Sequence, residues 1–225
     1  VIHQDALCRV DAVRGTPYII GRLGADLVDI LNPGHGWQIA AEYSVGAGTN
    51  PQDIAVISQE KAYVALYAQD YLLVVHPATG AQLGTVDLSA YADDDGIPEV
   101  AWLYPMDGKV YALVQRLSRF NGLLPSDYSQ ILVIDAQNYT VIDAVTLAQT
   151  NPLGKLRYNA ALERLVIIES GSCTEVLEGD SIDGAIEFFN PSDNTLSGPV
   201  ITGEALGGEP VDAVVVSWTK GYAIV

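Results

Sequence analysis

The sequence is poor in basic residues and has no long apolar run, and both shortages exclude classes of protein. Lysine and arginine number 11 against 28 aspartates and glutamates, a formal net charge of −17. A surface this acidic repels nucleic acid and anionic membrane, and it attracts cations or a basic partner. No apolar run reaches the ~18 residues of a membrane-spanning helix. We therefore expect no nucleic-acid partner and no membrane span.

Cysteine is scarce as well. Cys8 and Cys173 are the only two, and they lack the Cys-x-x-Cys spacing of zinc ribbons and haem attachment sites. In an oxidising compartment they could form a disulfide; pairing outside the chain and the reduced state are the alternatives. The chain begins at Val1 without a basic-then-apolar leader, as a mature secreted protein or a fragment would. We expect a secreted, extracellular or cell-surface protein, with the periplasm as an alternative.

Catalytic motifs are missing too. The three histidines, His3, His35 and His76, have no metal-ligand spacing between them. The sequence contains no Gly-x-Ser-x-Gly elbow, Walker loop or His-Glu-x-x-His motif. Ser170-Gly-Ser-Cys173 contains candidate nucleophiles, but no base can be assigned to them. We therefore name no catalytic residue.

Apolar residues, in contrast, are abundant and periodic. They make up 49% of the chain, enough for a packed core. A segment made of an apolar strand and the first residue of a turn recurs four times. It ends at Pro33, Pro77, Ala136 and Pro191, in steps of 44, 59 and 55 residues. A second set of anchors early in apolar strands keeps a similar rhythm, with steps of 45, 48, 54 and 57: Tyr18, Tyr63, Tyr111, Leu165 and Tyr222. Two sets of anchors with similar spacings indicate an internal repeat.

Each repeat has the pattern of four short strands. In the second unit these are residues 53–58, 61–67, 71–76 and 82–88, separated by turns such as Pro77-Ala-Thr-Gly80. Four strands every ~40–50 residues predict an all-β fold, a β-propeller of four-stranded antiparallel blades. A single barrel or sandwich would not need the repeated segment, and a β-helix would have a shorter period.

The second unit resembles the YVTN-type propeller repeat of secreted and surface proteins of bacteria and archaea. The resemblance rests on the segments Asn50–Val56, Lys61-Ala-Tyr-Val64 and Leu72–Gly80, and it weakens in the other units. Ala65-Leu66 replaces the usual Thr-Asn of the family. The resemblance implies blade architecture and brings no catalytic residues, because the motif is structural.

The repeat divides the chain into blades at about 1–48, 49–97, 98–150 and 151–204, with a partial blade at 205–225. Propellers close their rings, since an open ring leaves blade edges and faces unpaired. Four and a half blades therefore suggest part of a larger ring. Completion by the N-terminal strands or by a partner chain are the alternatives.

Acidic residues gather in three places where they could bind a cation. Asp93, Asp95 and Glu99 bring hard oxygens close together, and Gly96 allows the sharp turn that calcium loops require. A solvated acidic turn is the alternative. A second cluster lies in the insertion 170–184 and has the same two interpretations: Glu175, Glu178, Asp180 and Asp183. The third set recurs near first strands and could ring one mouth of the channel or join neighbouring blades: Asp53, Glu99 and Asp212.

The insertion at 117–129 is longer than a tight hairpin needs. With the arginine before it, it contains residue types that anchor interfaces: Arg116, Arg119, Phe120 and Tyr128. Long loops on rigid scaffolds often bind partners, and an ordinary covering loop is the alternative.

These features predict a non-enzymatic extracellular or cell-surface propeller that binds or scaffolds a protein or another macromolecule, with Ca²⁺ as its possible cofactor. One alternative is a propeller enzyme, such as a lyase, hydrolase or quinone-dependent dehydrogenase, with its site at the channel mouth. Another is a subunit of an extracellular assembly that docks through exposed blade edges.

Overall fold

The computed structural model describes residues 5–172 and 182–225, and nearly all of its regular structure is β-strand. Four sheets have four strands each, and every neighbouring pair of strands is antiparallel. The first two sheets are β1 (Ala6–Val10), β2 (Pro17–Gly21), β3 (Leu27–Asn32) and β4 (Gln38–Ser44), then β5 (Pro51–Val56), β6 (Ala62–Leu66), β7 (Tyr71–Val75) and β8 (Gln82–Asp87). The next two are β9 (Val100–Met106), β10 (Lys109–Val114), β13 (Gln130–Asp135) and β14 (Thr140–Thr146), then β15 (Arg157–Asn159), β16 (Arg164–Glu169), β17 (Ala185–Asn190) and β18 (Thr195–Thr202).

Smaller elements connect or extend these sheets. A hairpin of β19 (Asp212–Ser217) and β20 (Lys220–Ile224) forms the fifth unit. The two-stranded ribbon of β11 (Leu117–Ser118) and β12 (Leu124–Pro125) is inserted between β10 and β13. Four short helices complete the described part: η1 (Pro33–His35), η2 (Ser89–Tyr91), η3 (Arg119–Asn121) and α2 (Gly203–Leu206). None of the helices in the described ranges has the length or apolarity to cross a membrane.

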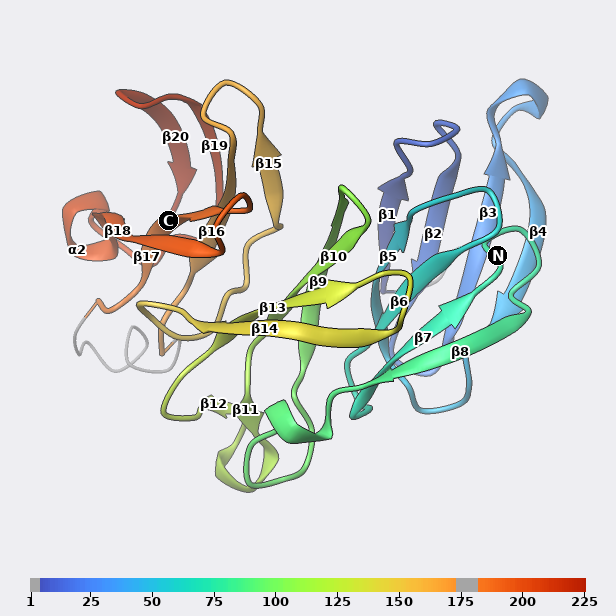
Figure 1. Cartoon of the computed structure of the whole chain (residues 1–225), viewed down its shortest axis with the longest axis horizontal. Coiled ribbons are helices and arrows are strands. Elements are labelled where there is room, and N and C mark those ends of the chain that lie inside the picture. Colours follow the sequence, from blue (N-terminus) through green and yellow to red (C-terminus); the bar gives the residue numbers. More distant parts are fainter. Residues whose placement is uncertain (1–4, 173–181) are drawn as a thin grey trace.

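Within each four-stranded sheet, the strands follow one another in sequence order. The sheets themselves follow one another as an arc, from the β1–β4 sheet to the β19–β20 hairpin (Figure 1). Their first strands lie closest together, with β5 packed against both β1 and β9. Strands β5–β8 begin and end within two residues of the ranges expected from the sequence. The four-stranded antiparallel unit expected from the repeat is therefore confirmed.

Alternation along each inner strand builds a core on both faces of a sheet. In β6, Ala62, Val64 and Leu66 pack toward the preceding sheet, whereas Tyr63 and Ala65 pack toward the following one. Strand β10 repeats this division between its two neighbouring sheets. Because side chains in a strand point alternately to opposite faces, an inner strand of Val, Ile, Leu and Tyr is buried throughout. Packing between sheets therefore holds the arc together.

The tyrosine anchors of the repeat lie at the boundaries between sheets. Tyr63 and Tyr111 are buried against the sheet that follows each of them. Leu165, the anchor of the fourth unit, also lies early in its strand, but it faces the preceding sheet, and Val166 occupies the boundary with the following one. Tyr222 lies on the last strand and is 65% exposed. A one-residue shift of register accounts for the exchange, since it moves each side chain to the other face.

The turn between β7 and β8 of the second unit requires glycine. Gly80 closes the turn between β7 and β8 with a φ of +70°, a region that side chains with a Cβ rarely adopt. A Cβ at this position would lie 2.3 Å from the ring of Tyr43 on β4 of the preceding sheet. The Pro-Ala-Thr-Gly phrase therefore lets two neighbouring sheets approach closely at their outer strands.

Candidate functional site

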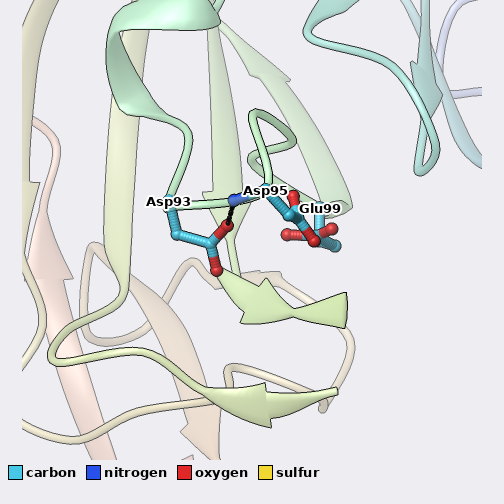
Figure 2. A group of neighbouring side chains, drawn as sticks. All are labelled: Asp93, Asp95 and Glu99. Carbon is cyan, nitrogen blue, oxygen red and sulfur yellow. Dashed lines mark hydrogen bonds between the residues drawn. The ribbon is translucent and has the colours of Figure 1, made fainter. Parts of the chain in front are cut away.

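The link between β8 and β9 folds into two consecutive aspartate turns. Asp93 Oδ1 accepts a hydrogen bond from the backbone N–H of Asp95 at 3.1 Å, and Asp95 Oδ1 accepts one from Ile97 N at 2.9 Å. Gly96 supplies the positive φ, +84°, that the sharp bend requires. These turns direct the carboxylates of Asp93, Asp95 and Glu99 to one place, where an oxygen of each lies within 4.8 Å of the others (Figure 2).

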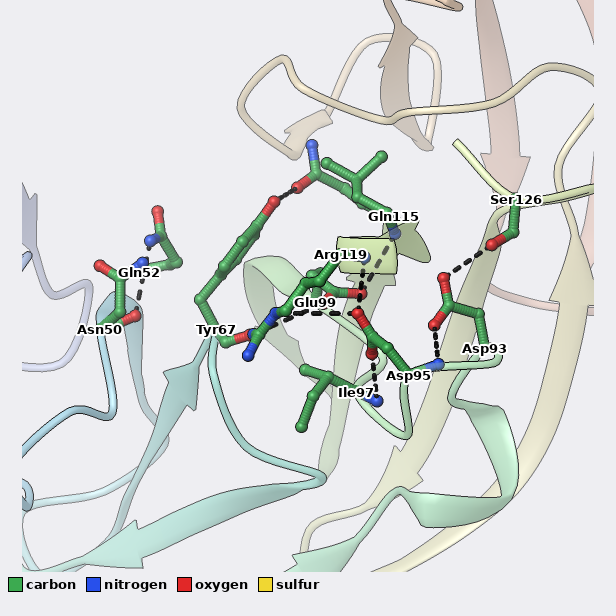
Figure 3. A network of polar contacts seen from close by, with 11 residues as sticks. Asn50, Gln52, Tyr67, Asp93, Asp95, Ile97, Glu99, Gln115, Arg119 and Ser126 are labelled. Atoms are coloured by element: carbon green, nitrogen blue, oxygen red, sulfur yellow. Dashed lines mark hydrogen bonds and ion pairs between the residues drawn. The ribbon is translucent and has the colours of Figure 1, made fainter. Parts of the chain in front are cut away.

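The same carboxylates fasten the inserted loop. Asp93 Oδ2 accepts a hydrogen bond from the hydroxyl of Ser126 at 2.6 Å, and Asp95 Oδ2 accepts one from the backbone N–H of Arg119 at 2.8 Å. Glu99 Oε2 accepts a bond from the backbone N–H of Leu117 at 3.1 Å. Figure 3 shows the link and the insertion facing each other across these bonds. The acidic turn therefore anchors the 116–128 insertion at three points.

Glu99 is the most perturbed member of the cluster. Its side chain is fully buried, and Oε1 receives no hydrogen bond from the described residues; Arg119 Nη2 lies 3.6 Å from it. Burial, together with the nearby Asp95 carboxylate, raises the pKa of Glu99 to about 8. One guanidinium group cannot neutralise three ionised carboxylates, so the cluster has a net negative charge that favours a divalent cation. Carboxylate oxygens are hard donors of the kind that Ca²⁺ prefers.

Glu99 also occupies a repeated backbone position. It has a φ of +50°, and Asn50 and Asn151, which precede the first strands of the second and fourth units, have φ values of +48° and +54°. Asparagine tolerates this left-handed conformation better than glutamate does. Where the second and fourth units have asparagine, the third unit therefore has a buried glutamate that faces the acidic turn.

The four residues expected to form an interface loop divide into two pairs. Arg116 is only 8% exposed, because it donates hydrogen bonds to the carbonyls of Tyr91 and Ala92 and lies 4.0 Å from the ring centre of Tyr128. Arg116 and Tyr128 therefore brace the base of the loop. Phe120, on η3, is 78% exposed, and the side chain of Arg119 is 40% exposed. Only this second pair is presented to solvent.

A chain of side-chain hydrogen bonds links neighbouring sheets beside the base of the 116–128 insertion. The hydroxyl of Tyr67 donates to Gln115 Oε1 at 2.8 Å, and Gln115 Nε2 donates to Asn151 Oδ1 at 2.7 Å (Figure 3 shows the first of these bonds). Asn151 Nδ2 continues this chain of bonds to the carbonyl of Gly171 at 3.2 Å. These bonds join the second, third and fourth units near the start of their first strands.

The three carboxylates expected at a channel mouth do not converge. Asp53 is buried, accepts a hydrogen bond from Leu103 N at 3.0 Å and lies 3.5 Å from Arg9. Burial raises the pKa of Asp53, and Arg9 opposes the rise. Asp212 forms a two-point ion pair with Arg157, which lowers the pKa of the carboxyl. Two of the three thus join neighbouring units, whereas Glu99 stays with the inserted loop of its own unit.

The remaining candidates lie apart. Cys8 is exposed on β1, and its possible disulfide partner Cys173 lies outside the described residues. Glu175, Glu178 and Asp180 lie outside them too, and Asp183 accepts a bond from Ser172 N at 2.9 Å.

The sequence analysis missed a pocket where basic residues meet between the first strands. Its signal was present in Lys155-Leu-Arg157, an alternation that places two cations two residues apart on an extended segment.

Comparisons with known proteins support the fold. No family model matches the chain, and no curated protein matches its sequence. The structure is similar to hydrazine synthase of Kuenenia stuttgartiensis (TM-score 0.61, 14% identity, 87% of this chain and 49% of that one). It is also similar to the WD40 β-propeller domain of Doa1 (TM-score 0.61, 12% identity, 99% of this chain and 62% of that one). A third neighbour is a protein from Lactobacillus plantarum (TM-score 0.54, 15% identity, 85% of this chain and 52% of that one).

These likenesses, together with the four-stranded sheets, show that the chain has a β-propeller fold. At identities this low they speak for the fold alone. The chain spans about half to three fifths of the length of the structures it matches. The narrower resemblance to YVTN-type repeats stays a prediction.

Proposed function

We propose that the chain is a non-enzymatic binding module of a secreted or cell-surface protein and that the 116–128 insertion contacts its macromolecular partner. One observation carries the proposal: a loop braced at its base displays a large apolar side chain at its tip. The bonds of Asp95, Glu99 and Arg116 support the base. Phe120 is 78% exposed and Leu123 51% exposed. Aromatic anchors on preorganised loops bind with a small loss of conformational entropy.

The extracellular part of the proposal is supported by the acidic composition and by the resemblance of the second unit to YVTN-type repeats. The alternative is a propeller enzyme whose site lies at the channel mouth. An adduct formed at the loop would favour the binding module. Turnover that depends on residues of the channel would favour the enzyme.

Photo-crosslinking from the tip of the loop tests the proposal. Replacing Phe120 with benzoylphenylalanine should give one ultraviolet-dependent adduct in an extract of the extracellular fraction. Replacing Trp37, an exposed aromatic residue on a different loop, supplies the matched control (62% exposed). An adduct at position 120 that is absent at position 37 supports the proposal. No adduct, or equal adducts at both positions, refutes it.

We propose in addition that Ca²⁺ binds Asp93, Asp95 and Glu99 and strengthens the anchoring of the loop. Without a cation, the raised pKa of Glu99, about 8, favours a proton on this carboxyl near neutral pH. Ca²⁺ would displace that proton and take a ligand oxygen from each carboxylate, and the half-exposed Arg119 side chain would turn away from Glu99.

Calcium titration in weakly buffered solution tests this second part. At pH 7, binding should release protons and raise the unfolding temperature, and Glu99→Gln should abolish both effects. Asp94→Asn is the control, because Asp94 is exposed and does not belong to the cluster. The calcium proposal fails if Ca²⁺ changes neither the proton release nor the unfolding temperature, or if both variants respond like the original chain.

A further inference from the structure

A pocket of about 510 Å³ lies where the first strands of four units approach one another. Its volume is within the range of about 300–1,000 Å³ that is typical of small-molecule sites. The aromatic rings of Tyr104 and Tyr158 form part of its lining, with centres 6.3 Å apart. Ile54, Val56 and Leu156 also border it, but their side chains are buried in the packing between sheets.

Basic residues concentrate in this pocket although the chain as a whole is strongly acidic. Arg9, Lys155 and Arg157 line it, three of only 11 basic residues in a chain of net charge −17. Asp11 is the acidic residue of the lining, and its carboxylate already accepts three backbone hydrogen bonds within its own turn. Among the residues that line the pocket, positive formal charge therefore exceeds negative, in contrast to the chain as a whole.

Two of the three cations are matched inside the protein. Arg9 donates to the carbonyl of Leu103 at 2.9 Å and lies 3.5 Å from Asp53. Arg157 forms a two-point pair with Asp212. These interactions fix both guanidinium groups at the wall of the pocket and largely neutralise their charges.

Lys155 is the unmatched cation. Among the described residues, its ammonium group has neither a hydrogen bond nor an ion pair, and the ring of Trp102 is 5.9 Å away. The side chain is about half buried. Burial lowers the pKa of Lys155, the neighbouring charge of Arg9 lowers it further, and the carboxylate of Asp53 opposes the shift. A half-buried ammonium group that lacks a direct partner favours an anion beside it.

We propose that this pocket binds a small oxyanion, a phosphate or carboxylate group, with Lys155 as its direct counter-charge. Arg9 and Arg157, each already paired with a carboxylate, border the site, and the two tyrosine rings fit an adjoining apolar portion of the ligand. The site is separate from the 116–128 insertion, so it neither requires nor excludes the proposed macromolecular partner.

Calorimetric titration with sodium phosphate and with sodium citrate tests the proposal, each at ionic strength matched with sodium chloride. Saturable binding of either probe supports it, and the stronger probe distinguishes a phosphate ligand from a carboxylate ligand. Binding of neither probe, or an equal response to sodium chloride, overturns it.

Variants locate the site. Lys155→Gln should weaken binding at least about tenfold, the effect of losing one well-placed charge. Lys155→Arg, which keeps the charge, should retain binding and also shows that substitution at this position is tolerated. Lys220→Gln removes the same charge from exposed β20 and should leave the affinity within about twofold of the original. Equal affinities for Lys155→Gln and Lys220→Gln would overturn the assignment. Phe120→Ala should leave anion binding intact, so the two proposals fail separately.

Discussion

A pair of buried carboxyl groups in the fourth sheet makes stability depend on pH. Glu169 on β16 and Glu187 on β17 are both fully buried. Glu169 Oε1 accepts a hydrogen bond from Gln149 N at 2.8 Å, and Glu187 Oε1 accepts one from Ala148 N at 3.0 Å. The second oxygen of each receives no hydrogen bond from the described residues, and the two carboxyl groups interact with each other. One shared proton therefore satisfies both oxygens.

Burial, together with the Glu187 carboxyl, raises the pKa of Glu169 to about 9. In the unfolded chain both groups ionise near the ordinary value of about 4.3, so unfolding releases a proton between these two limits. The stabilisation is complete below the unfolded pKa and is lost as the pH rises toward the folded pKa. Each pH unit in this window lowers the free energy of unfolding by about 1.4 kcal/mol, or about 4 kcal/mol between pH 5 and pH 8.

Glu169→Gln should remove this dependence. A glutamine amide can donate to Glu187 as the protonated carboxyl does, and its carbonyl oxygen can still accept from Gln149 N. We expect the variant to match the original chain near pH 5 and to exceed its stability by about 4 kcal/mol at pH 8. The assay is urea unfolding at pH 5, 6, 7 and 8, with the slope against pH as the readout.

The control is Glu60→Gln, which makes the same change at an exposed turn and should keep the original slope. Other buried acids, such as Glu99, contribute equally to all three proteins, so only the difference between slopes is interpreted. If Glu169→Gln and Glu60→Gln show the same slope, the carboxyl pair does not share a proton in the native state.

Three further changes test the packing between sheets. Arg9→Ala should cost about 3–5 kcal/mol of unfolding free energy, because it leaves the buried Asp53 without its counter-charge; a loss under about 1 kcal/mol in urea unfolding would contradict the pairing. Tyr63→Phe should cost about 1 kcal/mol, the value of its hydroxyl bond to a buried carbonyl, and unchanged stability would show that water replaces the bond. Gly80→Ala should lower the unfolding temperature by several degrees, since the new methyl group meets Tyr43 and the φ is unfavourable; an unchanged temperature would contradict the close approach.

The sheets could be predicted from the sequence because blade architecture is local. Each strand of the second unit is a short apolar run bounded by turn residues, and consecutive strands pair with each other. The face on which a side chain lies is harder to predict: Leu165 directly follows its basic residue, whereas Tyr63 and Tyr111 lie two residues after theirs, and Leu165 faces the preceding sheet. A shift of one residue leaves composition unchanged but exchanges the faces of a strand.

The carboxylate cluster could also be predicted, since Asp93, Asp95 and Glu99 lie within seven consecutive residues. The partners of the carboxylates were not, because Arg9 and Asp53, and Arg157 and Asp212, come from distant parts of the chain. Arg116 was expected to be exposed in a loop, and only the fold shows that Tyr91, Ala92 and Tyr128 surround it. Ion pairs between residues of different blades have no characteristic spacing along the chain, so a single sequence does not predict them.

The rigidity of the 116–128 insertion is the property on which the proposed binding role depends most directly. Amide hydrogen exchange measures it in the native protein. The backbone N–H groups of Leu117 and Arg119 bond to buried or half-buried carboxylates, and Ser126 N bonds to the carbonyl of Arg116 at 2.8 Å. We predict that these three amides exchange at least about a hundredfold more slowly than in an unfolded chain. Exchange at the unfolded rate throughout the insertion would show that the loop is not preorganised and would contradict the proposed function.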